Sequence, residues 1–214
     1  LTSIIGSLDT ASRPELAPES SAARDLLASA RRQATRLQRL IEDLLTVSRI
    51  DRGSLPLHPE ELRLRAFLSD LISAFPWAGD RLALRVEPPD LSVSADPDHL
   101  GRILINLVEN AGKYAPEGPV EVTARAAGSS FELVVADHGP GISPDQRESA
   151  FERFARLERS AIRSHGGTGL GLSIVRALSE AMGGEVTLAE TPGGGCTFSV
   201  NLPAAPGVRK ARAG

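Results

Sequence analysis

Apolar residues recur every three or four positions through the first part of the chain, which is the spacing of one helical face. A first short helix is predicted by four such residues: Leu1, Ile4, Ile5 and Leu8. Pro14 and Pro18 end it. A longer helix is predicted over residues 19–51, with a seam that alternates four and three apart as in a coiled coil: Ala30, Ala34, Leu37, Ile41, Leu44 and Ser48.

A long helix with an apolar seam has to bury that seam against another surface. Two helices alone do not enclose a roomy core, so a four-helix bundle made by two copies of the chain is favoured. The alternative is a helix that packs on the globular part of its own chain. We therefore expect residues 1–52 to form a helical hairpin and residues 19–52 to form a homodimer.

Beyond the long helix the pattern changes to alternating strands and helices. A linker with Gly and Pro is predicted over residues 53–61, a globular domain over 62–203 and a disordered tail over 204–214. Strands are predicted by their alternation: 82–86, 91–93, 120–126, 131–136, 185–189 and 197–202. The predicted fold class is therefore α/β.

Two helices are predicted in this domain, over residues 97–114 and 169–182. The first has Asp96 as its N-cap and Pro97 in its first turn, which are favourable residue types at these positions. A further helix start is predicted at Ser143, where Gln146 would complete a capping box.

The composition excludes several classes of protein. A length of 214 residues with 41% hydrophobic and 24% charged residues suits one or two soluble globular domains. A net charge of -3 implies no general affinity for nucleic acid. The single cysteine, Cys196, forms no internal disulfide, which suits a reducing cytosol. No apolar run approaches the roughly 20 residues of a membrane span, so no direct membrane contact is expected.

The chain begins without an initiator methionine. We therefore expect it to be the cytoplasmic portion of a longer, membrane-anchored protein.

The predicted helix 97–114 carries a polar stripe of Asn106, Asn110 and Lys113, opposite a core-facing apolar stripe. Asparagine is a mediocre helix former, so two in mid-helix need a reason. Their amide oxygens are suitable ligands for Mg²⁺, and Lys113 could meet a phosphate as a point charge. The alternative is an ordinary solvated face.

A second motif is Asp137-His138-Gly139-Pro140-Gly141, at the end of an apolar strand. The Asp137 carboxylate could accept a hydrogen bond from the adenine amino group, which would contribute roughly 1.5–3 kcal/mol. Guanine presents an acceptor at that place, so Asp137 would select ATP. Gly139 and Gly141 let the backbone turn close to the base. Many ordinary turns share this pattern.

A third motif is the glycine-rich segment 166–172, which precedes an apolar helix and could expose backbone N–H groups to phosphates. It is neither a Walker loop nor a dinucleotide fingerprint. Before it, Phe151 and Phe154 could anchor a mobile lid that residues 155–167 form. After it, a glycine turn leads into a strand, where Thr197 either reaches the base or is an ordinary strand residue.

The order and spacing of these motifs resemble the N, G1, F, G2 and G3 boxes of bacterial sensor histidine kinases. The resemblance covers nearly the whole chain. It implies a two-layer α/β sandwich shared with gyrase, MutL and heat-shock chaperone ATPases, with ATP and Mg²⁺ as cofactors. Those relatives usually have glutamate where this chain has Asn106, which favours the kinase branch. Its details look closest to potassium-sensing kinases of the Kdp type.

The resemblance also implies roles for individual residues. Asn106 and Asn110 would ligate Mg²⁺, Lys113 and Tyr114 would contact phosphates and lid, and Arg156 would lie near the γ-phosphate. The complete ATP-binding set implied by the motifs is Asn106, Asn110, Lys113, Tyr114, Asp137, Gly139, Gly141, Ile142, Phe154, Arg156, Gly167, Thr168, Gly169, Leu170, Gly171 and Leu172.

In that family the phosphorylated histidine lies on the first helix, and residues 1–6 are similar to the segment that follows it. The histidines of this chain do not fit that position: His58, His99, His138 and His165. We therefore expect the phosphoacceptor to lie upstream of residue 1, and this chain to bind ATP without phosphorylating itself. The implied reaction transfers the γ-phosphoryl group of ATP to histidine and then to an aspartate of a response regulator.

Three other readings stay open at this point. One is a dimerising nucleotide-binding module without transfer activity, and another is a serine kinase of the anti-sigma type with the same fold. The third is a chaperone-like ATPase.

Overall fold

The computed structural model describes residues 21–155 and 168–204. The chain divides into two compact units, Leu1–Asp51 and Arg52–Gly214. Several predictions lie outside the described residues: the short first helix, the tail from residue 205, most of the lid, and the site residues Arg156 and Gly167.

The first unit contains the predicted long helix, α2 (Ser21–Asp51). Apolar side chains remain exposed along it, including three of the predicted seam: Leu26, Leu37, Ile41, Leu44 and Leu45. This apolar surface is the one expected to meet a second copy. None of the helices in the described part of the chain is long and apolar enough to cross a membrane.

The second unit is built on a five-stranded sheet in the order β2-β4-β5-β7-β6. Strand β2 runs parallel to β4, and the other neighbouring pairs are antiparallel. The strand bounds are close to those predicted: β2 (Leu82–Glu87), β4 (Val120–Ala127), β5 (Ser130–Asp137), β6 (Glu185–Glu190) and β7 (Cys196–Pro203). The mixed sheet with its helices confirms the predicted α/β class.

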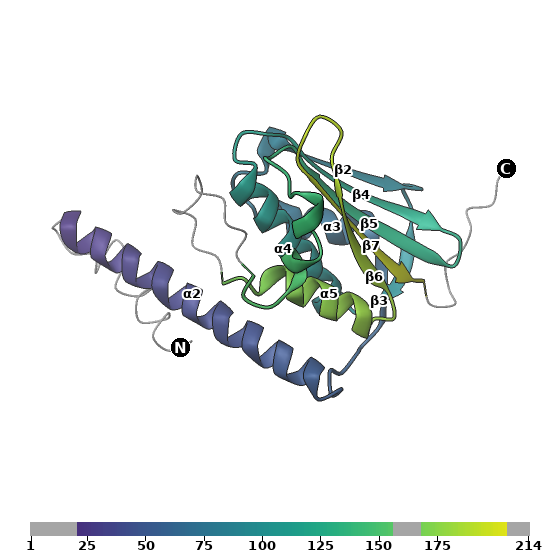
Figure 1. Ribbon diagram of the computed structural model, residues 1–214, viewed down its shortest axis with the longest axis horizontal. Helices are drawn as coiled ribbons and strands as arrows, with labels where there is room; N and C mark the ends of the chain where they lie inside the picture. The colour runs from purple at the N-terminus through teal and green to yellow at the C-terminus, as the bar shows by residue number, and fades with distance from the viewer. Residues whose placement is uncertain (1–20, 156–167, 205–214) are drawn as a thin grey trace. The chain divides into compact units, whose positions relative to one another are not determined.

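Three helices cover one face of this sheet (Figure 1): α3 (Leu64–Ser73), α4 (Pro97–Tyr114) and α5 (Gly171–Ala181). Because side chains alternate along a strand, Phe131, Leu133 and Val135 of β5 point into the layer between sheet and helices and are buried. The apolar stripe predicted on α4 closes this core from the other side: Leu100, Ile103, Leu104, Leu107, Val108 and Ala111.

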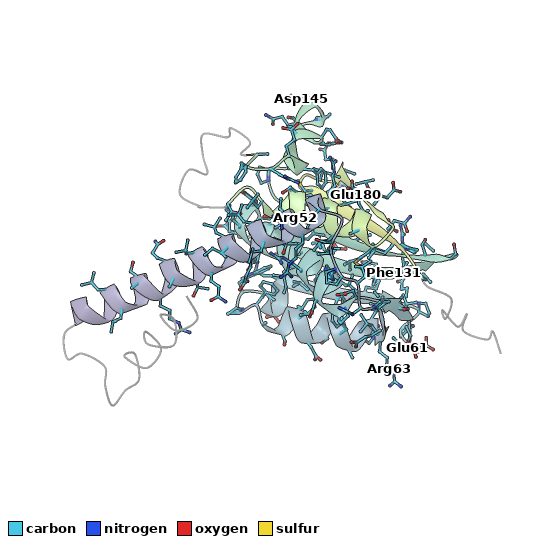
Figure 2. The ribbon with its side chains drawn as sticks, turned by 90° about the horizontal axis from the view of Figure 1, so that it is seen from below. Arg52, Glu61, Arg63, Phe131, Asp145 and Glu180 are labelled. Atoms are coloured by element: carbon cyan, nitrogen blue, oxygen red, sulfur yellow. The ribbon has the colours of Figure 1, made fainter. Side chains whose placement is uncertain are left out.

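A second, two-stranded sheet pairs β1 (Glu60–Arg63) antiparallel with β3 (Ser92–Ala95). The predicted linker 53–61 is therefore wrong at its end, since Glu60 and Glu61 belong to a strand. Glu61 and Arg63 point outward (Figure 2) and are exposed. A short strand with mostly charged residues carries almost no apolar alternation, so its pairing with β3 was invisible in the sequence.

Helix α3 is not among the predicted elements, although its buried residues Leu64, Leu68 and Ile72 follow helical spacing. The capping box predicted at Ser143 is not formed. A single 3₁₀ turn, η2 (Pro144–Gln146), follows Ser143, whose hydroxyl donates to the Gln146 side chain at 2.9 Å and caps no backbone N–H. Two further 3₁₀ turns are η1 (Gly79–Arg81) and η3 (Ser149–Phe151).

Helix α4 begins as predicted, with Asp96 as N-cap and Pro97 in its first turn. The buried Asp96 carboxylate accepts the backbone N–H of His99 at 2.9 Å and that of His58 at 2.8 Å. Burial works to raise the pKa of Asp96, but these bonds and the His99 imidazole outweigh it, so the pKa is lowered. One carboxylate thus joins the segment before β1 to the start of α4.

We expect Asp96→Ala to lower the free energy of unfolding by about 2 kcal/mol, because the variant loses a helix cap and leaves the His58 N–H unsatisfied. Urea denaturation followed by circular dichroism measures this change. The matched control is Asp98→Ala in the same helical turn, because Asp98 is exposed; its effect should stay within about 0.5 kcal/mol. Equal losses in both variants would contradict the role of Asp96.

Candidate functional site

The polar stripe of α4 begins with Asn106, whose side-chain N–H donates to the Arg102 carbonyl at 2.8 Å. This bond leaves the amide oxygen directed at α5, where a Cβ placed on Gly171 would lie 2.9 Å from it. Asn110 lies one turn further on and, within the described residues, its amide has no hydrogen-bond partner. Two hard oxygen atoms are therefore available on one helical face.

The last turn of α4 carries Lys113 and Tyr114. The Lys113 ammonium donates to the Tyr114 hydroxyl at 2.8 Å and lies 4.4 Å from the centre of the Tyr114 ring. The Tyr114 side chain is 41% exposed. A cation is thus held at the accessible end of the same helix that carries the two asparagines.

Asp137 is the last residue of β5, and its side chain is buried. Its Oδ1 atom accepts the backbone N–H of Gly139 at 2.9 Å and that of Cys196 at 3.2 Å. Neither bond uses Oδ2. The carboxylate is therefore fixed in orientation by one oxygen, while the other accepts no hydrogen bond from the described residues.

Glycines surround this carboxylate because the backbone comes too close for side chains. Gly195 has φ +114° and packs on the Asp137 carbonyl, where a Cβ would overlap the oxygen. Gly141 has φ +67°, and a Cβ on it would lie 3.0 Å from the Gly195 carbonyl oxygen. The turns after β5 and before β7 therefore interlock.

The N-terminus of α5 follows the glycine-rich segment. Gly169 has φ +72°, so the helix begins at Gly171 and not at residue 169 as predicted. Leu170 is the N-cap and makes no side-chain cap bond. Its side chain is fully buried and its N–H donates to the Thr168 hydroxyl at 3.1 Å, so the predicted ligand contact of Leu170 is not through its side chain. Leu172 and Ile142 are half-buried.

The two phenylalanines of the segment after η2 have different surroundings. Phe151 is buried and packs edge-on against Phe198, with 6.3 Å between the two ring centres. The Arg176 guanidinium lies 4.4 Å from the centre of the Phe151 ring. Phe154 is 62% exposed, has φ +61°, and donates its N–H to the Gly169 carbonyl at 2.9 Å. Phe151 thus anchors the segment, while Phe154 joins it to the glycine-rich motif.

For Thr197 the sequence allows either a base contact or an ordinary position in a strand. Its neighbours Cys196 and Phe198 are buried under the helices, so alternation directs Thr197 to the opposite face of the sheet. There its hydroxyl shares a hydrogen bond with Thr191 at 2.9 Å. The structure favours the ordinary strand residue.

Two family models match the chain. The model described as "Histidine kinase-, DNA gyrase B-, and HSP90-like ATPase" matches residues 95–206, and the "His Kinase A (phospho-acceptor) domain" model matches residues 1–53. The chain belongs to the histidine kinase-, gyrase- and HSP90-like ATPases. The presence of both domains identifies it further as a sensor histidine kinase core.

Relatives agree with this membership. Sensor protein RstB of Escherichia coli is 39% identical over 176 residues, covering 80% of this chain and 40% of RstB. Sensor protein KdpD of Rathayibacter rathayi is 36% identical over 175 residues, covering 82% of this chain and 20% of KdpD. These identities do not single out the potassium-sensing class. This kinase core spans less than half the length of either relative.

A solved structure supports the same fold. The crystal structure of full-length ShkA in complex with AMPPNP aligns with a TM-score of 0.79 and 30% identity, over 97% of this chain and 44% of ShkA. The likeness extends through both units.

The kinase core therefore contains the phospho-acceptor domain, although residues 1–53 include no histidine. His58, His99 and His138 lie in the ATPase-like unit, before β1, in the first turn of α4 and beside Asp137. His165 lies outside the described residues. The phospho-acceptor match disfavours the anti-sigma type of serine kinase.

The contribution of Cys196 and Gly195 to the Asp137 site is not predicted by the sequence. The two positions are far from Asp137 in the chain, and a glycine turn before a strand carries no signal of its partner. Only the register of β5 with β7, which pairs Ala136 with Thr197, brings the Cys196 N–H to the carboxylate.

Burial raises the pKa of the Asp137 carboxyl, and the N–H groups of Gly139 and Cys196 and the nearby His138 only partly oppose this shift. The folded-state pKa therefore lies above the unfolded value. Ionisation of Asp137 therefore lowers the free energy of unfolding. This destabilisation is absent at pH values below the unfolded pKa and reaches its full size once the pH has risen through the folded pKa.

We expect Asp137→Asn to raise the free energy of unfolding of the ligand-free kinase core at pH 7 by about 1 kcal/mol, because an amide oxygen can still accept both N–H groups without a buried charge. The gain should disappear as the pH falls toward 4. Urea denaturation at several pH values measures it. The control, Asp145→Asn at an exposed position (Figure 2), should leave the pH dependence unchanged. A pH-independent difference would contradict the raised pKa.

Proposed function

We propose that this kinase core binds ATP with Mg²⁺ and transfers the γ-phosphoryl group to a histidine imidazole. The phosphoryl group would then pass to an aspartate in the receiver domain of a response regulator. The observation that carries the proposal is the buried Asp137 carboxylate, fixed by two backbone N–H groups through one oxygen. Family membership supports the assignment of the nucleotide.

Adenine recognition would use the Oδ2 atom of Asp137, which accepts no hydrogen bond from the described residues. A buried carboxylate oxygen accepts the adenine amino group as a charge-assisted hydrogen bond. Guanine has a carbonyl oxygen there, and two acceptors facing each other in a buried site repel. Gly139, Gly141 and Ile142 would line the base, because they follow Asp137 directly and are only half-buried.

The triphosphate would lie between α4 and the N-terminus of α5. The first N–H groups of α5 have no side-chain cap, and such groups bind anions. Lys113 would contribute a positive charge and Tyr114 a hydroxyl. The remaining proposed contacts are in or next to the glycine-rich segment and the lid: Phe154, Arg156, Gly167, Thr168, Gly169, Leu170, Gly171 and Leu172.

Mg²⁺ would be held by Asn106 and Asn110. The fit rests on the Asn106 oxygen, which faces the start of α5, and on the Asn110 amide, which has no hydrogen-bond partner among the described residues. Two amide oxygens suit an ion that prefers hard ligands and retains several waters. When bound, the ion would neutralise charge on the phosphate oxygens. Lys113 and the α5 N–H groups would orient the phosphoryl group, so that catalysis is mainly positioning and charge stabilisation.

We expect the ATP analogue AMPPNP with Mg²⁺ to bind this chain and the matching GTP analogue not to bind, as measured by isothermal titration calorimetry. Asp137→Ala should weaken AMPPNP binding by at least roughly tenfold, since a hydrogen bond to a charged group contributes roughly 1.5–3 kcal/mol. Asp70→Ala, at an exposed position on α3, is the control and should bind like wild type. No binding by folded wild-type protein would overturn the proposal.

Transfer chemistry separates this proposal from its alternatives. We expect no autophosphorylation of this chain with ATP, because residues 1–53 contain no histidine. Steady-state ATP hydrolysis would instead favour a chaperone-like ATPase. Nucleotide binding by a longer protein that never forms acid-labile phosphohistidine would favour the non-catalytic module.

The cytoplasm, where ATP and response regulators occur, is the proposed location.

We also propose that α2 forms a homodimer. Its exposed apolar side chains include Leu37, Ile41 and Leu44, which are 49%, 40% and 48% exposed. They repeat at coiled-coil spacing, and the phospho-acceptor match covers the same residues.

We expect the double variant Leu37→Glu/Ile41→Glu to be monomeric under conditions in which the wild type dimerises, because two buried carboxylates per chain would face each other in the seam. Sedimentation equilibrium measures the change. Gln33→Glu, at another exposed position of α2, is the control and should leave the association unchanged. A variant that still dimerises would place the interface elsewhere.

A further inference from the structure

The C-terminal end of α4 is held by an arginine from the segment before β2. The Arg81 Nη2 atom donates to the carbonyl of Ala115 at 2.6 Å and to that of Gly118 at 3.0 Å, and its Nε atom reaches Gly118 at 3.3 Å. Ala115 is the C-cap residue that follows Tyr114. A guanidinium at this place binds the unpaired carbonyls and complements the helix dipole.

Trp77 packs on the same turn of α4. A Cβ placed on Gly112 would lie 2.5 Å from two carbon atoms of the indole ring, so any larger residue would displace the ring or the helix. The Arg81 guanidinium lies 5.2 Å from the centre of the Trp77 ring. Glycine inside a helix is unfavourable relative to alanine because it loses more backbone freedom on folding. This packing supplies the reason for glycine between Asn110 and Lys113.

The Gly118 carbonyl connects this end of α4 to the segment around Asp137. A Cβ on Gly118 would lie 3.2 Å from both Cβ and the carbonyl oxygen of His138, which follows Asp137. Arg81 therefore bonds, through one side chain, to the end of α4 and to a turn that packs beside the adenine-binding aspartate.

We propose that Arg81 and Trp77 are positioning residues that fix the last turn of α4, with Lys113 and Tyr114, at the correct distance from Asp137. The inference rests on the proposed function, because it takes Lys113 as the phosphate-side contact and Asp137 as the base contact. Asp137 is held independently by Gly139 and Cys196. Loss of the clamp therefore displaces the phosphate side and leaves the base side in place.

The test compares two ligands, AMPPNP with Mg²⁺ by calorimetry and adenosine by chemical-shift titration of the Gly139 amide. Arg81→Met should lower the affinity for AMPPNP roughly tenfold, the effect of one charge-assisted hydrogen bond, and change that for adenosine less than about twofold. The affinity of Arg81→Lys for AMPPNP should lie between those of the wild type and Arg81→Met, because lysine keeps the charge without the planar guanidinium group. The control is Arg85→Met on β2, since the Arg85 side chain is 76% exposed and lies 3.9 Å from Glu87.

A second pair of variants keeps the inference testable if Arg81→Met does not fold. Gly112→Ala should weaken AMPPNP binding several-fold and leave adenosine binding nearly unchanged, because the new methyl group displaces the last turn of α4 from the Trp77 ring. Trp77→Leu, which removes the indole ring, should have the same selective effect. Equal loss of affinity for both ligands, or no loss for either ligand in a variant with a lower Tm, would each overturn the inference. Wild-type protein that binds neither ligand would instead overturn the proposed function itself.

Discussion

The site depends on a single buried carboxylate. Asp137 ends the central strand β5 inside the protein, where an ionised group is unfavourable unless it is hydrogen-bonded. Two backbone N–H groups satisfy one of its oxygens, and one of them comes from Cys196 across the β5–β7 ladder. That contact requires the preceding turn to lie against the Asp137 backbone, which only glycine at position 195 permits. The interlocked glycine turns are consequences of placing this charge in the core.

Helix α4 connects this carboxylate to the rest of the site. Its start is fixed by Asp96, its apolar stripe is buried under α3, α5 and the sheet, and its end is fixed by Arg81. A glycine near each end lies close to a neighbouring segment: a Cβ placed on Gly101 would lie 3.4 Å from Leu71 of α3, and one placed on Gly112 would lie 2.5 Å from the Trp77 ring. The polar stripe with Asn106 and Asn110 therefore lies on a helix whose position is determined along its whole length.

Several unfavourable features coincide with surfaces for which we propose a partner. The raised pKa of Asp137 reflects a buried carboxylate that bonds to described N–H groups through one oxygen only. The ring of Phe154 is exposed at a backbone φ of +61°, next to the glycine-rich motif. The apolar seam of α2 is exposed in the single chain. A protein selected for stability alone would lose such features, so each is better explained by a ligand or a second subunit.

Short-range physics determined much of this protein from its sequence. Helical spacing predicted α2, alternation predicted β4 and β5, and the Asp96 cap with Pro97 predicted the start of α4, because each depends on neighbours within a few residues. The order of the motifs predicted the family. Tertiary structure alone decided the pairing of β1 with β3, the Cys196 bond to Asp137 and the packing of Trp77 on Gly112. Those contacts join segments distant in the chain, and strand register and helix packing, which no local pattern encodes, bring them together.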